Sequence, residues 1–261
     1  MKISRLFVSK PNKKTSPLIA AANLILVCAF IVAVFWLSLR AVGVAFNFSF
    51  VVDFRQRLWD GFLMTLALSL VSLVLSLFIG ALAALGQLSR VLALKYLCNI
   101  YVNFIRGTPL IMQIYLFFYI IGTAWGVSNR FVAGAIVLSV FEGAYIAEII
   151  RGSLLSIEKS QLEAAKAVGF SRRQTVKNVI LPQLVARTLP ALTGQFASII
   201  KDSSLLSIIA VIELTQTIRE ITATNFQFFS CYIFLGVAYL CLTLPLSFFS
   251  HRLERRFNYE N

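Results

Sequence analysis

The chain has 261 residues, of which 59% are hydrophobic and only 13% are charged, and its formal net charge is +13. A water-soluble domain of this length needs much more polar surface, so the composition excludes an ordinary soluble enzyme or binding domain. The apolar residues gather into runs of about 20 residues, long enough for a helix to cross roughly 30 Å of hydrocarbon. Because the alternation typical of an outer-membrane barrel is absent, we predict an all-α, polytopic membrane protein.

Six membrane-spanning helices are predicted, at about 18–39, 62–86, 98–122, 131–150, 189–212 and 227–250. The first follows a basic lead-in, as a signal peptide does, but its apolar stretch of about 22 residues exceeds the roughly 7–15 of a signal peptide. We therefore expect it to be retained as an anchor. The predicted organisation is a basic tail at 1–17, an extra span and outer loop at 18–58, a five-span core at 59–251 and a C-terminal tail at 252–261.

The basic residues are distributed unevenly between the two sides of the predicted membrane. With the N-terminus inside, 17 of the 24 Lys and Arg residues lie in inner segments and five lie in outer ones. This asymmetry is typical of a bacterial inner-membrane protein with both termini in the cytoplasm. Since topology accounts for the positive charge, the charge does not indicate a nucleic-acid partner.

No catalytic or cofactor site is predicted. The four cysteines fall in or near the spans without a Cys-x-x-Cys pair, and His251 is the only histidine, so no metal ligand set emerges. The chain also has no Gly-rich loop ending in Gly-Lys-Ser/Thr that would cradle the phosphates of ATP. We therefore expect a protein that is not an enzyme and needs no cofactor of its own.

Charged and polar residues inside the spans mark candidate transport sites, because a charge at the bilayer centre costs about 2.5–3.5 kcal/mol on insertion scales. Lys201 and Asp202 interrupt the fifth span and, being adjacent, cannot face each other on a helix. Two carboxylates of the fourth span are the expected partners of Lys201. The predicted substrate path comprises Gln113, Glu142, Glu148, Lys201, Asp202 and Ser203. Structural ion pairing between helices remains the alternative for these charges.

The third span opens with Arg106-Gly107-Thr108-Pro109, which predicts a bent entry with Arg106 extending toward the inner surface. Glu142 lies beside two small residues that permit close helix approach. A carboxylate in a cavity suits a cationic solute, so Glu142 is the strongest candidate for facing the transported molecule.

Residues 159–182 are polar and carry strong helix signals. Two pairs match the capping-box pattern that starts a helix, namely Ser160 with Glu163 and Ser171 with Gln174. Gly169 suits the left-handed position just past the first helix, and Pro182 is expected to end the second. Two short capped helices between membrane spans form a rigid handle that another protein can grip.

This segment resembles the hallmark of ABC importer permeases, in which Glu-Ala-Ala is followed after three residues by Gly and after nine more by Ile-x-Leu-Pro. Here it reads Glu163-Ala164-Ala165, Gly169 and Val179-Ile180-Leu181-Pro182, with Val179 in place of Ile. Three further blocks are similar to permeases for polar amino acids such as histidine, glutamine or arginine. They begin at Arg106, Gly143 and Lys201, and the likeness covers residues 60–257.

The resemblance implies a type I importer architecture and a division of labour. A binding protein outside delivers the amino acid, two permease subunits form the path, and two ATPase subunits bind ATP inside. Helix 161–168 would dock on an ATPase, with Leu162, Glu163, Ala164, Ala165 and Gly169 as the coupling residues. The chain departs from the family in its extra first span, in Ile157–Ser160 where Pro and Gly are usual, and in Glu142, which occupies an often small or polar position.

A carrier driven by a proton or sodium gradient is the competing hypothesis, with the intramembrane carboxylates as its coupling site. A membrane-embedded enzyme is a third class, for which the sequence offers no catalytic cluster.

Overall fold

The structure is a computed structural model that describes residues 16–43 and 45–257, with side chains described as far as Leu253. Most of the predicted tails, 1–17 and 252–261, therefore lie outside the described residues. Within the described part every regular element is helical and no strand occurs, as predicted. The chain divides into two compact units, residues 1–47 and 48–261, which are described separately.

The first unit contains one long helix, α2 (Pro17–Val42), which begins with Pro17 in its first turn and ends at Gly43 in the left-handed conformation. None of its residues is buried within the chain. Its polar side chains bond back to its own backbone, since Asn23 Nδ2 donates to the Ile19 carbonyl at 2.8 Å and Ser38 Oγ to that of Val34 at 2.8 Å. Such a helix is suited to a hydrocarbon environment, where every polar group needs an internal partner.

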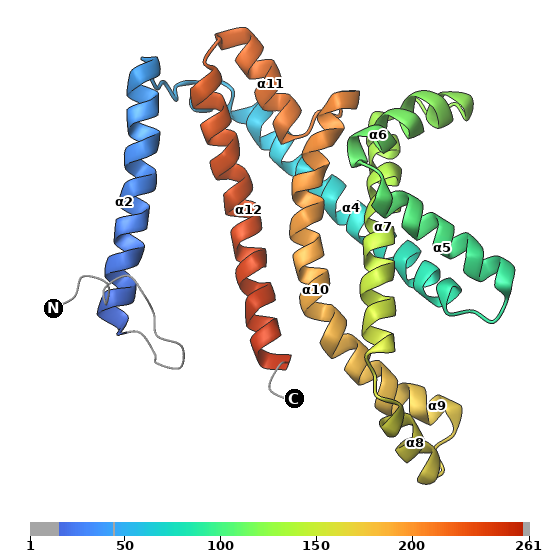
Figure 1. Cartoon of the computed structure of the whole chain (residues 1–261). Helices are drawn as coiled ribbons and strands as arrows, with labels where there is room; N and C mark the ends of the chain where they lie inside the picture. The colour runs from blue at the N-terminus through green and yellow to red at the C-terminus, as the bar shows by residue number, and fades with distance from the viewer. Residues whose placement is uncertain (1–15, 44, 258–261) are drawn as a thin grey trace. The chain divides into compact units, whose positions relative to one another are not determined.

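The second unit is a bundle of long helices with short helices at both ends (Figure 1). Its elements in chain order are α3 (Phe50–Asp53), α4 (Arg55–Gln87), α5 (Leu92–Gly107), α6 (Leu110–Tyr115), the π-helical η1 (Leu116–Gly122), α7 (Arg130–Leu155), α8 (Lys159–Ala167), α9 (Arg172–Thr175), the π-helical η2 (Val176–Ile180), α10 (Leu181–Asp202), the 3-10 helix η3 (Ser203–Ile209), α11 (Leu214–Asn225) and α12 (Phe228–Phe257).

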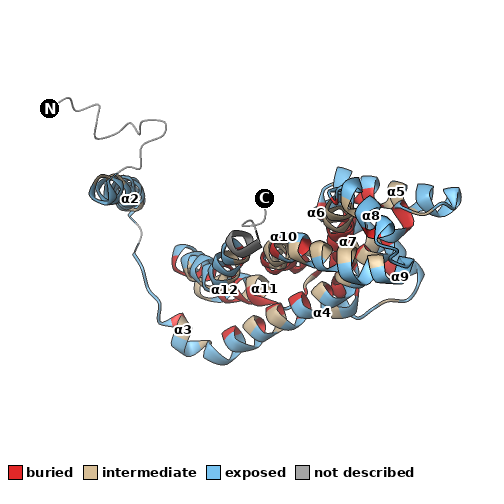
Figure 2. Cartoon of the chain, turned by 90° about the horizontal axis from the view of Figure 1, so that it is seen from below, coloured by how far each residue is buried: buried red, intermediate tan, exposed pale blue. Residues whose placement is uncertain are grey.

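Helices α4 and α7 form the main packing interface of this unit, and small residues make it possible. A Cβ placed on Gly80 would lie 2.6 Å from Ile146 Cγ2, and one on Gly143 would lie 2.8 Å from Ile79 Cγ2. Close backbone approach at small residues is the usual way in which membrane helices associate. The buried residues accordingly concentrate where α4, α7 and α10 meet (Figure 2).

Four helices of the described chain are long and apolar enough to cross a membrane: Pro17–Val42, Arg55–Gln87, Arg130–Leu155 and Phe228–Leu253. They correspond to the first, second, fourth and sixth predicted spans. The span predicted at 98–122, with its bent entry, corresponds to α5 and the α6–η1 segment, which meet at an angle of 113° and form either one broken span or a re-entrant loop. The cause of the bend is Pro109, two residues beyond the end of α5, which has no backbone N–H to continue the hydrogen bonding of that helix.

The fifth predicted span, 189–212, differs from the structure in its bounds. Helix α10 begins earlier, at Leu181, and its α-helical part ends at Asp202, where the tighter η3 takes over. It is not among the helices that meet the criterion of length and apolarity. Helix α10 nevertheless lies between α7 and α12, and its neighbours supply the polar partners described below (Figure 1).

Candidate functional site

The predicted handle forms a compact projection at one end of the bundle, where α8 and α9 lie beyond the ends of α7 and α10 (Figure 1). Helix α8 ends in a Schellman motif, in which the Gly169 amide donates to the Lys166 carbonyl and the Phe170 amide to that of Ala165, both at 3.0 Å. Gly169 has a φ of +83°, so the predicted left-handed position is confirmed. The turn exists because glycine has no Cβ to oppose that conformation.

The second predicted capping box is confirmed and the first is wrong. Ser171 Oγ accepts from the Gln174 amide at 3.3 Å while Gln174 Oε1 accepts from the Ser171 amide at 2.8 Å. At α8 the N-cap residue is instead Glu158, whose side chain caps no backbone amide. Ser160 donates to Glu158 Oε2 at 2.9 Å, but it lies inside the first turn of α8 and therefore is not in the N-cap position.

Pro182 does not end the second helix, contrary to the prediction. Helix α9 continues through η2 into α10, with Pro182 in the first turn of α10. The widened π turn explains this continuity: the Leu181 amide bonds back five residues to the Val176 carbonyl, just where the proline interrupts the ordinary pattern. The handle is thus joined rigidly to α10 and is not separated from it by a loop.

One side-chain contact ties the handle to α10, and a second joins α10 to the end of α7 just before the handle. Gln183 Nε2 of α10 donates to Gln161 Oε1 of α8, and Arg187 Nη1 donates to the Ser156 carbonyl at 2.6 Å. Within α8 only Ala165 is buried, packed toward α9 and η2. The other residues of the predicted coupling set, Leu162, Glu163, Ala164 and Gly169, are exposed together with Val168 and Phe170. A small, partly apolar surface of this kind is available for another protein.

A polar cluster lies inside the bundle between α7 and α10. Glu142 has no exposed surface, and one of its carboxylate oxygens, Oε2, accepts a hydrogen bond from Gln195 Nε2. The other oxygen has no hydrogen-bond partner among the residues that the structure describes. The carboxyl group of Asp202 is a direct neighbour. The structure thus brings together two of the predicted path residues, Glu142 and Asp202.

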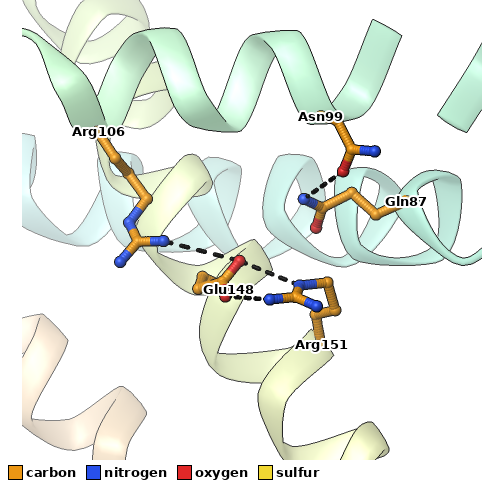
Figure 3. A network of polar contacts seen from close by, with 5 residues as sticks. All are labelled: Gln87, Asn99, Arg106, Glu148 and Arg151. Atoms are coloured by element: carbon orange, nitrogen blue, oxygen red, sulfur yellow. Dashed lines mark hydrogen bonds and ion pairs between the residues drawn. The ribbon is translucent and has the colours of Figure 1, made fainter. Parts of the chain in front are cut away.

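Glu148 takes part in a different network (Figure 3). Arg151 Nε, one turn along α7, donates to Glu148 Oε2 at 3.1 Å and a second guanidinium nitrogen bonds Oε1. Arg106 Nη1 from the end of α5 lies 3.7 Å from the same carboxylate, and its guanidinium lies over the Tyr145 ring at 5.5 Å. The prediction that these carboxylates pair with Lys201 is therefore wrong. Glu148 pairs with Arg106 and Arg151, and Glu142 accepts from the Gln195 side-chain amide. Lys201 is exposed in the chain.

Gln113 and Ser203 are buried and serve the backbone. Gln113 Nε2 donates to the Ile105 carbonyl at 2.8 Å and to Thr108 Oγ1 at 2.7 Å. It thereby satisfies acceptors left open where Pro109 breaks the chain of helical hydrogen bonds. Ser203 Oγ donates to the Ile200 carbonyl at 2.8 Å at the start of η3. Each side chain thus stabilises a point where the α-helical hydrogen bonding is interrupted, Gln113 at the bend before α6 and Ser203 at the start of η3.

Two polar residues of the bundle, Gln195 and Glu213, are not among the residues predicted from the sequence. Gln195 precedes Asp202 by seven residues, two helical turns, so the shared face was readable from the sequence. Glu213, just beyond the predicted end of the fifth span, caps α11 by accepting from the amides of Thr215 and Gln216, each at 2.8 Å. Tyr239 of α12 donates to it at 3.0 Å. Burial raises the pKa of the Glu213 carboxyl, and these hydrogen bonds oppose the increase.

Residues 76–259 match the family of binding-protein-dependent transport system inner membrane components. The chain belongs to this family. The matched region begins within α4 and includes the handle, the polar cluster and α12, whereas α2 precedes it. The family places the chain among multi-pass transport proteins of the inner membrane, which are not themselves ATPases, and speaks against a carrier that needs no binding protein.

Relatives of this inner membrane component are permeases. The glutamine transport system permease protein GlnP of Escherichia coli (strain K12) is 38% identical over 213 residues, which is 81% of this chain and 97% of that protein. The L-cystine transport system permease protein TcyB of Bacillus subtilis (strain 168) is 36% identical over 207 residues, 77% of this chain and 88% of that protein.

Solved structures share the fold. The crystal structure of an amino acid ABC transporter with histidines is similar with a TM-score of 0.75 and 30% identity, covering 81% of this chain and 99% of the other. An inward-facing structure of the MetNI methionine ABC transporter, at 20% identity and a TM-score of 0.63, has the same fold over 81% of this chain and 99% of its own.

Proposed function

We propose that the chain is the permease subunit of an ATP-driven importer of polar amino acids. The observation that carries the proposal is the capped, exposed handle at residues 159–182, whose Glu-Ala-Ala and Gly positions match the permease pattern. Relatives at 34–38% identity named as glutamine and L-cystine permeases support the substrate class. The chain itself carries no ATP-binding loop in its sequence, so a separate subunit supplies the energy.

The proposed assembly contains two permease subunits, two ATPase subunits and an extracytoplasmic binding protein that delivers the amino acid. Leu162, Glu163, Ala164, Ala165 and Gly169 form the surface that docks on the ATPase. Moving a two-state transporter from 1:99 to 99:1 takes about 5.5 kcal/mol of differential binding. The Schellman motif, the capping box at Ser171 and the unbroken passage into α10 support such a transfer of force, because they leave no flexible link.

The proposed substrate path runs past the polar cluster between α7 and α10. Glu142 and Asp202, two carboxyl groups that lie next to each other inside the bundle, are suited to a cationic group of the solute. Gln113, Glu148, Lys201 and Ser203 stay in the proposed path as groups that shape it, since three of them are already engaged by protein partners. The distribution of Lys and Arg supports placing both termini and the handle in the cytoplasm.

The test is uptake in proteoliposomes that contain the permease, its proposed ATPase partner and its proposed binding protein. ATP inside the vesicles should drive uptake of a polar amino acid, and a proton ionophore should leave that uptake intact. Uptake that continues without ATP and collapses with the ion gradient would instead establish the carrier hypothesis.

A further inference from the structure

An apolar groove lies between the end of α4 and the start of α5. It has a volume of about 640 Å³. Its walls are mostly apolar and include the aliphatic side chains of Ile79, Leu82, Leu85, Leu94 and Leu97. Tyr101, the main polar side chain in the wall, donates its hydroxyl hydrogen to the Val140 carbonyl at 2.6 Å, so that group is already satisfied. The groove therefore suits a hydrocarbon chain.

The groove is held open by contacts on its inner side. At Gly86 the two helices approach so closely that a Cβ would lie 2.3 Å from Cys98 Sγ. One residue further along α4, Gln87 Nε2 donates to Asn99 Oδ1 of α5 at 3.1 Å (Figure 3). These contacts fix the floor of the groove, while Leu82, Leu85 and Leu97 remain exposed along its rim.

Two basic residues neighbour the groove in the sequence, Arg90 in the turn between the helices and Lys95 near the start of α5. Arg90 lies directly after Ser89, which lines the groove, and Lys95 lies directly after Leu94 in its wall. Both cations are exposed, and neither forms an ion pair with the side chains that the structure describes. The sequence contains no Asp or Glu between Asp60 and Glu142, so no nearby carboxylate of this segment offsets the charge.

We propose that this groove binds an anionic phospholipid, with one acyl chain between α4 and α5 and the phosphate at Arg90 and Lys95. An anionic lipid matches both features, because its acyl chain suits the apolar walls and its negative headgroup suits the two basic residues. A water-soluble protein partner fits less well, because the rim lies on helices whose composition places them in the bilayer. The inference requires only that the chain is a membrane protein, and is independent of the transported solute.

The experiment uses the full-length permease in nanodiscs of equal parts phosphatidylglycerol and phosphatidylcholine, with lipids retained on release counted by native mass spectrometry. The wild type should retain phosphatidylglycerol preferentially. Replacing Arg90→Gln and Lys95→Gln together should lower that retention about tenfold, since basic residues supply the attraction. Leu94→Gln with Leu97→Gln should lower it as well, because the exposed aliphatic wall holds the chain.

The matched control is Arg172→Gln with Arg173→Gln, which removes the same charge from exposed positions in the handle. It should leave lipid retention unchanged. Equal retention of both lipids by the wild type would overturn the proposal. Unchanged retention in the Arg90 and Lys95 variant would overturn it too. An equal loss in the control would also overturn it, because the loss would then follow from net charge alone.

Discussion

The handle at residues 159–182 and the polar cluster around Glu142 are both polar regions of an apolar protein, and they are built in opposite ways. In the handle, backbone groups and neighbouring side chains within a few residues close the turns, as in the Schellman motif at Gly169. In the cluster, the partners come from different helices, with Gln195 and Asp202 on α10 facing Glu142 on α7.

The difference separates two tasks. A local, capped structure keeps its shape while the bundle moves, which is what a docking surface needs. A cluster assembled across two helices changes whenever those helices move, so it can present a binding group in one state and withdraw it in another. A transporter needs both, and here each is placed where its construction suits it.

The largest expected effect tests the handle. Replacing Glu163→Lys should reduce ATP-driven uptake at least about fiftyfold, because reversing an exposed charge in a docking surface adds repulsion without disturbing the fold. The measurement is uptake in the reconstituted system, with the amount of inserted permease determined in parallel.

Glu158→Lys is the matched control, since it makes the same charge change at an exposed position just before α8. It should retain most of the uptake. If Glu163→Lys transports normally, or if both variants lose activity equally, the handle is not a specific docking surface and the contrast between the two regions fails.

A smaller, selective effect tests the cluster. Glu142→Gln keeps the shape of the side chain but removes its ionisable carboxyl group, so uptake of a cationic amino acid should fall about tenfold relative to a neutral one, roughly 1.4 kcal/mol. Competition between labelled arginine and glutamine measures the ratio. Glu213→Gln is the control, because it also removes a carboxyl group with no exposed surface. If Glu213→Gln changes the ratio of arginine to glutamine uptake by the same factor, Glu142 does not lie in the substrate path.

The smallest effect concerns Glu213, which is buried like Glu142. Its carboxyl group caps α11 by accepting from backbone amides, as the Ser171 hydroxyl does in the handle. Because burial raises the pKa of Glu213, the native state holds its proton more tightly than the unfolded state. Its contribution to the free energy of unfolding is therefore full below the ordinary carboxyl pKa of about 4.3 and is lost as the pH rises through the native value.

Thermal unfolding of the detergent-solubilised protein between about pH 4 and about pH 8 measures this effect. The midpoint should decline with rising pH in the wild type and decline less in Glu213→Gln. A variant with the same slope as the wild type would assign the pH dependence to other groups.

Features with a local or compositional cause were predictable from the sequence. Spans at 18–39, 62–86, 131–150 and 227–250 follow from apolar length, and the positive φ of Gly169 follows from the residue itself. The errors arose where two signals compete. Ser160 matched a cap but lies inside α8, and Pro182 matched a stop but is accommodated by the π turn of η2.

The sequence by itself determined that this chain is an all-helical membrane protein with a capped handle, because hydropathy and turn chemistry act over a few neighbouring residues. Only the tertiary structure decided which charges meet. Glu148 lies with Arg106 and Arg151, and Glu142 with Gln195 and Asp202, because the close packing of α4 against α7 and the position of α10 fix which helix faces point together. Partner choice between distant helices depends on that packing, which no local pattern encodes.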